Sequence, residues 1–533
     1  MTMTEACVYS LARSLVVGLV AWPLCRVQTN WLRSLSDRRR AWAWWLVFLP
    51  FLCPELWTGY AWSGFAARLT GMGLWPSAAG TGTRQPLAIL GRDALVDEVL
   101  LDLLLLFRAI PVGTLALYFA PPPRVSRAAW YCWQQATSPT ARIMHTPVRT
   151  AGDQAGPAEL SPRDTSTREQ TGNPRYNRWR ASLQFWLERQ GARWPAWALM
   201  TLVTFQEFEL ASLLGRPAWT VWLFDAQVGG LALTESLRKT LLPVLCQATV
   251  LLPLMIWAFR QRASATTNAC EPAPRHWYTS LVSWLAIGLG LLFLIGLPAL
   301  HVGRDTWNGL WRVVQSPSQF RTLLSEIGAG LVYSLTAAGL TTFAVAILWR
   351  RAQSTRWGTI SLCLCSGPGL IGPLVTGLAL IRLLQEPGLR LIYKTPVSLL
   401  LGLVLWLLPR GFLLRALLQN STPTQGSHLA RLLSVAPAPR VRGAAGELLW
   451  KLRWRREFWG VVVLAYWAFF DLTTASLLAP VTIVSAPVML YNQMHFGKNA
   501  TLSALVLLTV LIPLGIFAVA GWSRRFLSVW LWR

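Results

Sequence analysis

Residues 277–299 read WYTSLVSWLAIGLGLLFLIGLPA, a continuous apolar run without a single charged side chain. A bilayer core about 30 Å thick needs about 20 apolar residues per helix, and a helix satisfies its own backbone hydrogen bonds in lipid. The run therefore predicts a membrane-spanning helix. Ten further stretches that are mostly apolar, some with one or more charged residues, predict spans near 7–25, 41–65, 94–119, 195–215, 238–259, 326–349, 357–384, 393–413, 458–480 and 500–523.

The composition of the whole chain supports this interpretation. Of its 533 residues, 53% are hydrophobic and only 14% are charged, whereas about 25% are charged in soluble domains. The 31 tryptophans suit a protein that crosses the membrane–water boundary many times. A net charge of +26 also fits a nucleic-acid partner, but such binding needs a soluble domain with a basic face. The sequence predicts no such domain, so we expect no nucleic-acid partner.

Lysine and arginine gather in alternate loops, which predicts the direction of the chain through the membrane. The basic segments are the tail after 523 and 26–40, 120–194, 260–276, 350–356 and 410–457. If these segments lie inside, they hold nearly three times as many Lys and Arg residues as the outside loops, 34 against 12. We therefore expect an all-α polytopic protein of the cell inner membrane, with about 11 spans, the amino terminus outside and the carboxyl terminus inside.

Two further expectations concern charged residues. Arg13, Arg108 and Arg382 lie within predicted spans but near their ends, so we expect their side chains to snorkel to the membrane surface. Residues 136–176 are rich in Ser, Thr, Pro, Gly and charges and cannot bury enough apolar surface to fold alone. This segment is predicted to be a flexible cytoplasmic insertion.

The sequence contains no pattern typical of catalysis or metal binding. The eight cysteines and five histidines are scattered without zinc-ligand spacing. The Gly-Lys pair at 497–498 is followed by Asn, so the phosphate loop of ATP-binding proteins is absent. We expect no enzyme activity, no cofactor and no metal site. The first apolar run has no basic leader or cleavage site and is predicted to be a retained span.

Three segments recur in the same order along the chain, which predicts an internal repeat. The matched pairs are Ser14-Leu15 with Ser334-Leu335, Thr58-Gly59-Tyr60-Ala61 after Pro54 with Thr376-Gly377-Leu378-Ala379 after Pro373, and residues 205–214 (FQEFELASLL) with 469–478 (FFDLTTASLL). The repeat predicts two pseudo-symmetric helical bundles that run parallel through the membrane. We call residues 1–262 the first half and residues 263–533 the second half.

Four stretches carry a resemblance to a known family: RRRAWAWWLVFLPFLCPELWTGYAW (38–62), FQEFELASLLGRPAWTVWLF (205–224), YSLTAAGLTTFAVAILWRR (333–351) and LTTASLLAPVTIVSAPVMLYNQMHFGKNATLSALVLL (472–508). The chain resembles the fused two-domain permeases of binding-protein-dependent ABC importers, of the ferric iron and thiamine type, with a MetI-like transmembrane fold. The resemblance covers about a third of the chain. It implies a five-helix core per half, two copies of a cytoplasmic ATPase subunit and an extracytoplasmic solute-binding protein. The family has six spans per half, so the predicted missing span is the first.

The resemblance also implies an inside loop in each half that forms a short helix seated in the ATPase. The family pattern is Glu-Ala-Ala followed, after three residues, by Gly. The corresponding residues here are Ala128 and Ala129 in the first half, and His428, Leu429, Ala430 and Ser434 in the second half. Only the alanines agree with the pattern. Two interpretations follow: the ATPase has diverged to accept these loops, or coupling has been lost.

Acidic residues within predicted spans are the remaining candidates for function, because an ionised group in lipid needs a cavity or a partner. They are Glu55, Asp102, Glu207, Glu209 and Asp471. Glu207 and Asp471 hold equivalent positions in the repeat. Together with Glu209 they are candidate pathway residues for a cationic substrate. The alternative is that these acids cap broken helices or form bonds across the packed bundle.

Three functions stay open at this point. The first is an importer permease, with ferric iron as the lead substrate through the resemblance and with thiamine, another small cation or an oxyanion behind it. The second is a transport-inactive membrane scaffold derived from such a permease. The third is a secondary transporter, which parallel repeats without paired midplane acids disfavour. The partners implied by the first function are the two ATPase subunits, the solute-binding protein and membrane lipids.

Overall fold

A computed structural model describes residues 1–65, 86–119, 193–261, 276–393, 395–420, 424–435, 438–480, 484–494, 497 and 499–531. Within these ranges every regular element is a helix. The predicted insertion 136–176, together with Ala128 and Ala129, lies outside the described residues.

The described helices of the first half are α1 (Met3–Ser34), α2 (Asp37–Leu52), α3 (Glu55–Trp62), α5 (Pro86–Phe119), α9 (Arg193–Phe205), α10 (Glu209–Leu213), α11 (Trp219–Val228), α12 (Leu233–Lys239) and α13 (Leu241–Gln261). Those of the second half begin with α14 (Trp277–Leu291), the π-helical turn η1 (Leu292–Gly296), α15 (Leu297–Gln315), α16 (Pro317–Ser354), α17 (Arg356–Ile371), α18 (Pro373–Leu384) and α19 (Pro396–Asn420). They continue with α20 (Thr424–Ser434), α21 (Pro439–Leu449), the π-helical turn η2 (Trp450–Trp454), α22 (Arg455–Phe470), α23 (Leu472–Leu478), α24 (Ala486–Met494) and α25 (Ala500–Leu531).

Six stretches of the described chain are long and apolar enough to cross a membrane: Met3–Ser34, Leu95–Tyr118, Trp277–Gln315, Pro317–Ala352, Pro396–Arg415 and Ala500–Ala520. Two bent pairs raise this number to eight if each pair is one span. The pair Ile360–Ile371 and Pro373–Leu384 is bent by 110°, and the pair Glu457–Phe470 and Leu472–Leu478 by 60°. The chain is therefore an all-helical, multi-pass membrane protein, as its composition predicts.

The other predicted spans coincide with shorter or interrupted helices. Residues 41–65 form α2 and α3, residues 195–215 form α9 and α10, and residues 238–259 fall largely in α13. The count of eleven spans, the orientation and the parallel symmetry of the halves stay predictions.

Proline sets two of the helix breaks, one in each half. Proline has no N–H to donate and its ring clashes with the preceding turn, so a helix ends before it. Pro54 separates α2 from α3, and Pro373 is the first residue of α18. Gly372, just before Pro373, has a φ of +111°, a conformation that glycine adopts without strain. The repeated Pro and Thr-Gly motifs thus start a new helix in both halves.

Glycine brings the new helices against their neighbours at equivalent positions. A Cβ atom on Gly59 would lie 2.6 Å from Leu213 Cδ1, and one on Gly377 would lie 2.7 Å from Leu477 Cδ1. Both glycines come from the repeated Thr-Gly motif, and both leucines come from the repeated Ala-Ser-Leu-Leu motif. The repeated sequences therefore form the same local contact twice, between α3 and α10 and between α18 and α23.

A second pair of glycines extends this correspondence beyond the motifs found in the sequence. Gly113 of α5 packs against Cys25 of α1 and Met200 of α9. Gly411 of α19 packs in the same way against α16 and α22. Each glycine lies two residues after a proline. In the sequence this correspondence consists only of a proline and a glycine two residues later. It becomes recognisable in the structure, where three helices meet at each glycine.

The helix that runs through α14, η1 and α15 links the two halves. Trp284 of α14 meets Trp31 of α1 edge to face with ring centroids 5.5 Å apart. Ile287 is buried in one cluster with Trp31 and with Ala43 and Val47 of α2. Farther along, α15 packs along α25. The first described helix of the second half therefore begins against the first half and ends against α25.

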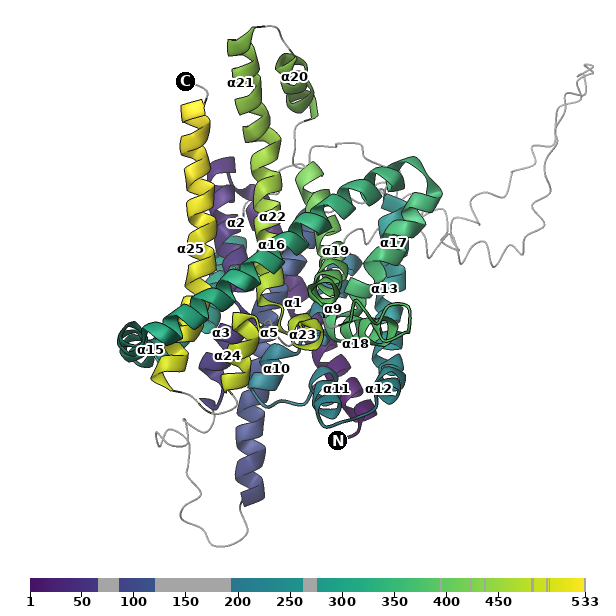
Figure 1. Ribbon diagram of the computed structural model, residues 1–533, viewed down its shortest axis with the longest axis vertical. Coiled ribbons are helices and arrows are strands. Elements are labelled where there is room, and N and C mark those ends of the chain that lie inside the picture. The colour runs from purple at the N-terminus through teal and green to yellow at the C-terminus, as the bar shows by residue number, and fades with distance from the viewer. Residues whose placement is uncertain are drawn as a thin grey trace, which may run out of the picture.

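The helices α20 and α21 form a hairpin that projects from one end of the bundle, the end that also carries the end of α25 (Figure 1). The start of α1 lies at the other end of the molecule (Figure 1). From Pro439 to Phe470 the segments α21, η2 and α22 follow one another without a gap in the helix. The hairpin is thus joined by continuous helix to the interior of the bundle.

The close approach at Gly113 predicts a measurable packing cost. A Cβ atom there would lie 2.6 Å from Cys25 Sγ and still closer to Met200 Sδ, so we expect Gly113→Ala to destabilise the protein by about 1–3 kcal/mol. Gly339→Ala on α16 is the matched control, because nothing lies within 4 Å of its added Cβ. Thermal unfolding of both variants in detergent tests this expectation, and equal melting temperatures would contradict it.

Candidate functional site

Acidic side chains cap the short helices α10 and α23, which follow two of the helix breaks. The first N–H groups of a helix have no partner within the helix, and inside a membrane they need another acceptor. Glu207 Oε1 accepts a hydrogen bond from Leu210 N at 3.0 Å, and Asp471 Oδ2 accepts one from Thr474 N at 3.2 Å. In both cases the acid caps the short helix that follows it, α10 or α23, from three residues upstream.

Glu209 makes the corresponding bond between the halves. Its Oε1 accepts a hydrogen bond from Leu472 N at 3.2 Å, so a carboxylate of the first half caps α23 of the second half. Glu209 and Asp471 are 9% and 6% exposed. Two of the three candidate pathway residues thus meet at the start of α23, and Glu207 lies at the start of α10. The structure gives all three the capping role that the sequence left as an alternative.

Polar side chains from the same breaks join the two halves. Ser212 Oγ and Tyr491 OH are 2.6 Å apart, and Tyr60 OH and Ser503 Oγ are 2.8 Å apart. Three further bonds reach backbone carbonyls across the halves, from Tyr466 OH to Leu52 O, from Gln206 Nε2 to Leu370 O and from Trp62 Nε1 to Phe293 O. The broken helices therefore lie at a hydrogen-bonded interface between the halves.

The prediction that Arg13 snorkels is wrong. Its side chain is buried and donates to Glu98 Oε1 from Nε at 2.9 Å and from Nη2 at 2.5 Å. Glu98 Oε2 accepts a further bond from Arg216 Nε at 3.0 Å, and Asp102 lies 3.4 Å from Arg13. The charges of Arg13 and Arg216 are balanced by those of Glu98 and Asp102, so the guanidinium of Arg13 is compensated inside the protein instead of by water. We call these four residues the ionic cluster.

Arg108 does not snorkel either, whereas Arg382 stays at the surface. Arg108 is 6% exposed, pairs with Glu55 and donates to Cys53 O at 2.8 Å. Its charge therefore supports the turn between α2 and α3. Arg382 pairs with Glu386 at 3.0 Å, and about half of each side chain is exposed.

Glu98 and Arg216 are site residues that the sequence analysis missed. Glu98 lies one helical turn before Asp102 within a predicted span, and this acidic spacing was the available signal. Arg216 lies in the turn after α10, where its charge alone points to no partner. Both partners of the cluster are far from Arg13 in the sequence, so only the fold brings them together.

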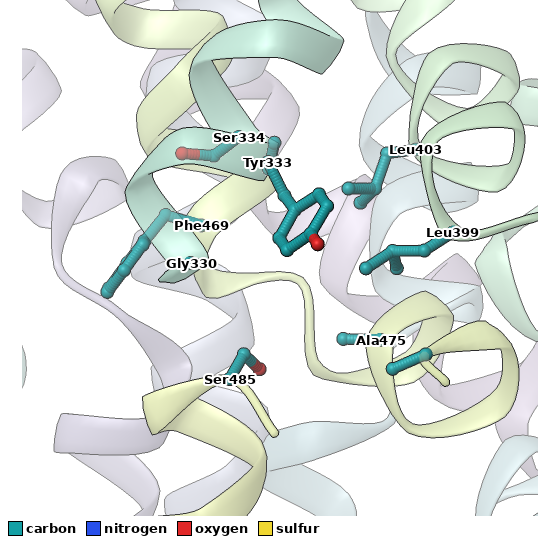
Figure 2. A pocket seen from close by; sticks show the side chains of 10 residues that line it. Gly330, Tyr333, Ser334, Leu399, Leu403, Phe469, Ala475 and Ser485 are labelled. Carbon is teal, nitrogen blue, oxygen red and sulfur yellow. The ribbon is translucent and has the colours of Figure 1, made fainter. Parts of the chain in front are cut away.

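A pocket in the second half is lined by small and apolar side chains (Figure 2). Its lining residues come from α16, α19, α22, α23 and the segment after α23: Gly330, Tyr333, Ser334, Leu399, Leu403, Ala468, Phe469, Ala475, Ala479 and Ser485. None of them is charged. The Tyr333 ring lies among the labelled side chains in the middle of the view (Figure 2). The polar side-chain atoms of this lining are the hydroxyl groups of Tyr333, Ser334 and Ser485, so the pocket is uncharged.

Tyr333 and Arg13 occupy the same position of the repeat, because each immediately precedes the repeated Ser-Leu. The following serines also agree, since Ser14 Oγ donates to Leu11 O and Ser334 Oγ donates to Leu331 O, at 2.9 and 3.0 Å. One half therefore fills this position with the ionic cluster, and the other leaves a neutral pocket.

The hairpin carries the predicted coupling residues of the second half. Ala430 is fully buried, and α20 packs along α21. Leu429 and Leu432 are 54% and 60% exposed, and His428 is exposed as well. Ser434 is half-buried and donates to Arg431 O at 2.6 Å. The hairpin thus presents leucines outward at the end of the bundle.

The capping role of Asp471 predicts a difference between two substitutions. Asp471→Asn keeps an oxygen acceptor for Thr474 N and should change stability little, whereas Asp471→Ala should cost about 1 kcal/mol. Thermal unfolding in detergent measures both. Equal losses for the two variants would show that the charge, and not the cap, is what matters.

Arg108 and Arg382 form a matched pair for testing buried charge. Arg108→Met leaves Glu55 without its partner inside the bundle and should destabilise by about 3–5 kcal/mol. Arg382→Met removes an exposed pair and should cost at most about 1 kcal/mol. The ratio of folded to aggregated protein after detergent extraction, with melting temperature, separates the two. Similar behaviour would rule out a structural role for the buried pair.

Comparison of the chain with protein-family models, curated proteins and solved structures finds no match.

Proposed function

We propose that this chain is the membrane permease of an ABC-type importer in the cell inner membrane, with its amino terminus outside. The observation that carries the proposal is the α20–α21 hairpin, with its exposed leucines at the end of the bundle opposite the start of α1 (Figure 1). Leu429, Leu432 and Leu433 lie three and four residues apart and so share one helix face. An amphipathic helix of this kind docks into an apolar groove of a partner protein.

The position of the hairpin in the chain supports the same proposal. It lies between α19 and α22, where the resemblance to importer permeases implies the ATPase-binding helix. Under this proposal the ATP is hydrolysed by two separate subunits seated beneath the hairpin and its counterpart. The chain itself is then not an enzyme.

The broken helices support a transport role. Transporters commonly build their pathways from discontinuous helices at the interface of two repeats. Here each half contributes two broken helices, and hydrogen bonds join the halves at the breaks. We propose that the substrate passes at this interface, delivered by an extracytoplasmic solute-binding protein.

Ferric iron remains the proposed substrate through the family resemblance alone. Glu207, Glu209 and Asp471 all accept backbone hydrogen bonds. A cation that used these carboxylates would have to share them with the helix N-termini or displace those bonds. The neutral pocket at Tyr333 favours an uncharged group at that position.

A transport-inactive scaffold is the second candidate, because His428 and Ser434 stand where the family has Glu and Gly. Both candidates use the hairpin as a docking surface, but they differ in the partner. An ATPase subunit is expected for the permease and another protein for the scaffold.

Purification of the native complex in mild detergent tests the proposal. We expect an ATPase subunit at two copies per chain, identified by mass spectrometry and by vanadate-sensitive ATP hydrolysis. Leu429→Ser combined with Leu432→Ser should reduce this recovery at least tenfold, because it removes two exposed apolar side chains. Leu391→Ser is the control, since Leu391 is 90% exposed in the segment between α18 and α19. A complex without any ATPase would overturn the importer function.

A further inference from the structure

Two thiols from distant parts of the first half lie side by side. Cys7 Sγ of α1 and Cys246 Sγ of α13 are 4.0 Å apart, although 239 residues separate them in the sequence. The other buried cysteines have partners of a different kind. Cys25 donates to Ile110 O, and Cys53 donates to Leu294 O. The Cys7–Cys246 approach is therefore a specific feature of the contact between α1 and α13.

The two sulfurs lie at about van der Waals contact distance. A disulfide has sulfurs about 2.05 Å apart, so the two sulfurs need to close by about 2 Å. The position of each sulfur is set by χ1, the rotation about the Cα–Cβ bond. A change of χ1 moves the sulfur without unfolding a helix. Cys7 is 1% exposed and Cys246 is half-buried. A reagent therefore reaches Cys246 first.

We propose that Cys7 and Cys246 form a disulfide that joins α1 covalently to α13. The oxidant is a protein or small-molecule disulfide. The Cys246 thiolate attacks one sulfur of that disulfide, forms a mixed disulfide and releases the first thiolate of the donor. The Cys7 thiolate then attacks Cys246 Sγ and releases the second. The pair loses two electrons and two protons, and the donor disulfide becomes two thiols.

The bond would belong to the first half only. Cys7 lies seven residues before Ser14, and the residue seven before Ser334 in the second half is Ile327, which is buried and has no sulfur. In the first half the bond would connect the first described helix of that half to its last. It would also fix α13, which packs on both α9 and α17, relative to α1.

The place of the pair suits a disulfide under the proposed function. Cys7 is near the start of α1, at the end of the molecule away from the hairpin (Figure 1). The orientation in the proposed function puts this end outside, where disulfides persist. The occurrence of the bond in cells rests on that orientation, whereas the ability of the pair to form it rests only on the geometry.

The test begins with the purified full chain in detergent, treated with oxidised glutathione. Free thiols are then blocked with N-ethylmaleimide and the digested protein is analysed by mass spectrometry. We expect a peptide that links Cys7 to Cys246 and disappears with dithiothreitol. The oxidised protein should also melt at a higher temperature than the reduced one, and Cys246→Ser should abolish this difference. Cys25→Ser is the control and should retain the linked peptide.

Two results would overturn the proposal. One is the alkylation of both cysteines in oxidised, still folded protein. The other is a stable mixed disulfide of Cys246 with glutathione that Cys7 does not resolve. The same analysis of acid-quenched native membranes tests the orientation. A bond that forms in the purified protein but is absent from these membranes would overturn the outside position of Cys7. Recovery of the ATPase subunits is measured separately, so the two proposals fail independently.

Discussion

The structure depends on one constraint, which is that a helix interrupted inside a membrane exposes N–H groups that lipid cannot satisfy. In the described residues each half contains two such breaks, and the repeat places Glu207 and Asp471 at equivalent positions of one break in each half. Glu207 caps α10 and Asp471 caps α23, each within its own half, while Glu209 of the first half caps α23 of the second. The acids that are costly in a membrane are therefore the groups that satisfy the first N–H groups of α10 and α23. The interface between the halves follows from the same requirement.

The two halves share these helix breaks but differ in the side chains at the position of Arg13 and Tyr333. Where the first half has the ionic cluster around Arg13, the second half has Tyr333 and a neutral pocket. The cluster ties α1, α5 and the turn after α10 together through charge-assisted hydrogen bonds. In the second half the corresponding position is lined by uncharged side chains. The two halves thus differ at this position in the kind of contact that joins their helices.

The sequence predicted the features that depend on neighbours in the chain. Apolar runs gave the helical membrane fold, and the repeated motifs marked the positions where helices start again after Pro54 and Pro373. The helix that begins at Trp277 continues to Gln315, well beyond the predicted end at 299, because its last turns are amphipathic and escape a search for apolar runs.

Contacts between distant residues could not be predicted in this way. Arg13 pairs with Glu98, which lies 85 residues away in the sequence, and Glu209 bonds to Leu472, which lies 263 residues away. An arginine near the end of an apolar run looks the same in the sequence whether it reaches water or a buried carboxylate. For the same reason the candidate acids were recognised, but their capping role stayed one of two alternatives.

The unbroken helical path from Pro439 to Phe470 connects the hairpin to the interior of the bundle without a flexible joint. At 1.5 Å per residue this path is a rod about 48 Å long. It begins where α20 meets α21 and ends at Asp471, the residue that starts α23 at an angle of 60°. A displacement applied to the hairpin is thus delivered at the joint where Glu209 of the first half holds Leu472 of the second. The rod therefore connects the hairpin directly to the place where the two halves share a hydrogen bond.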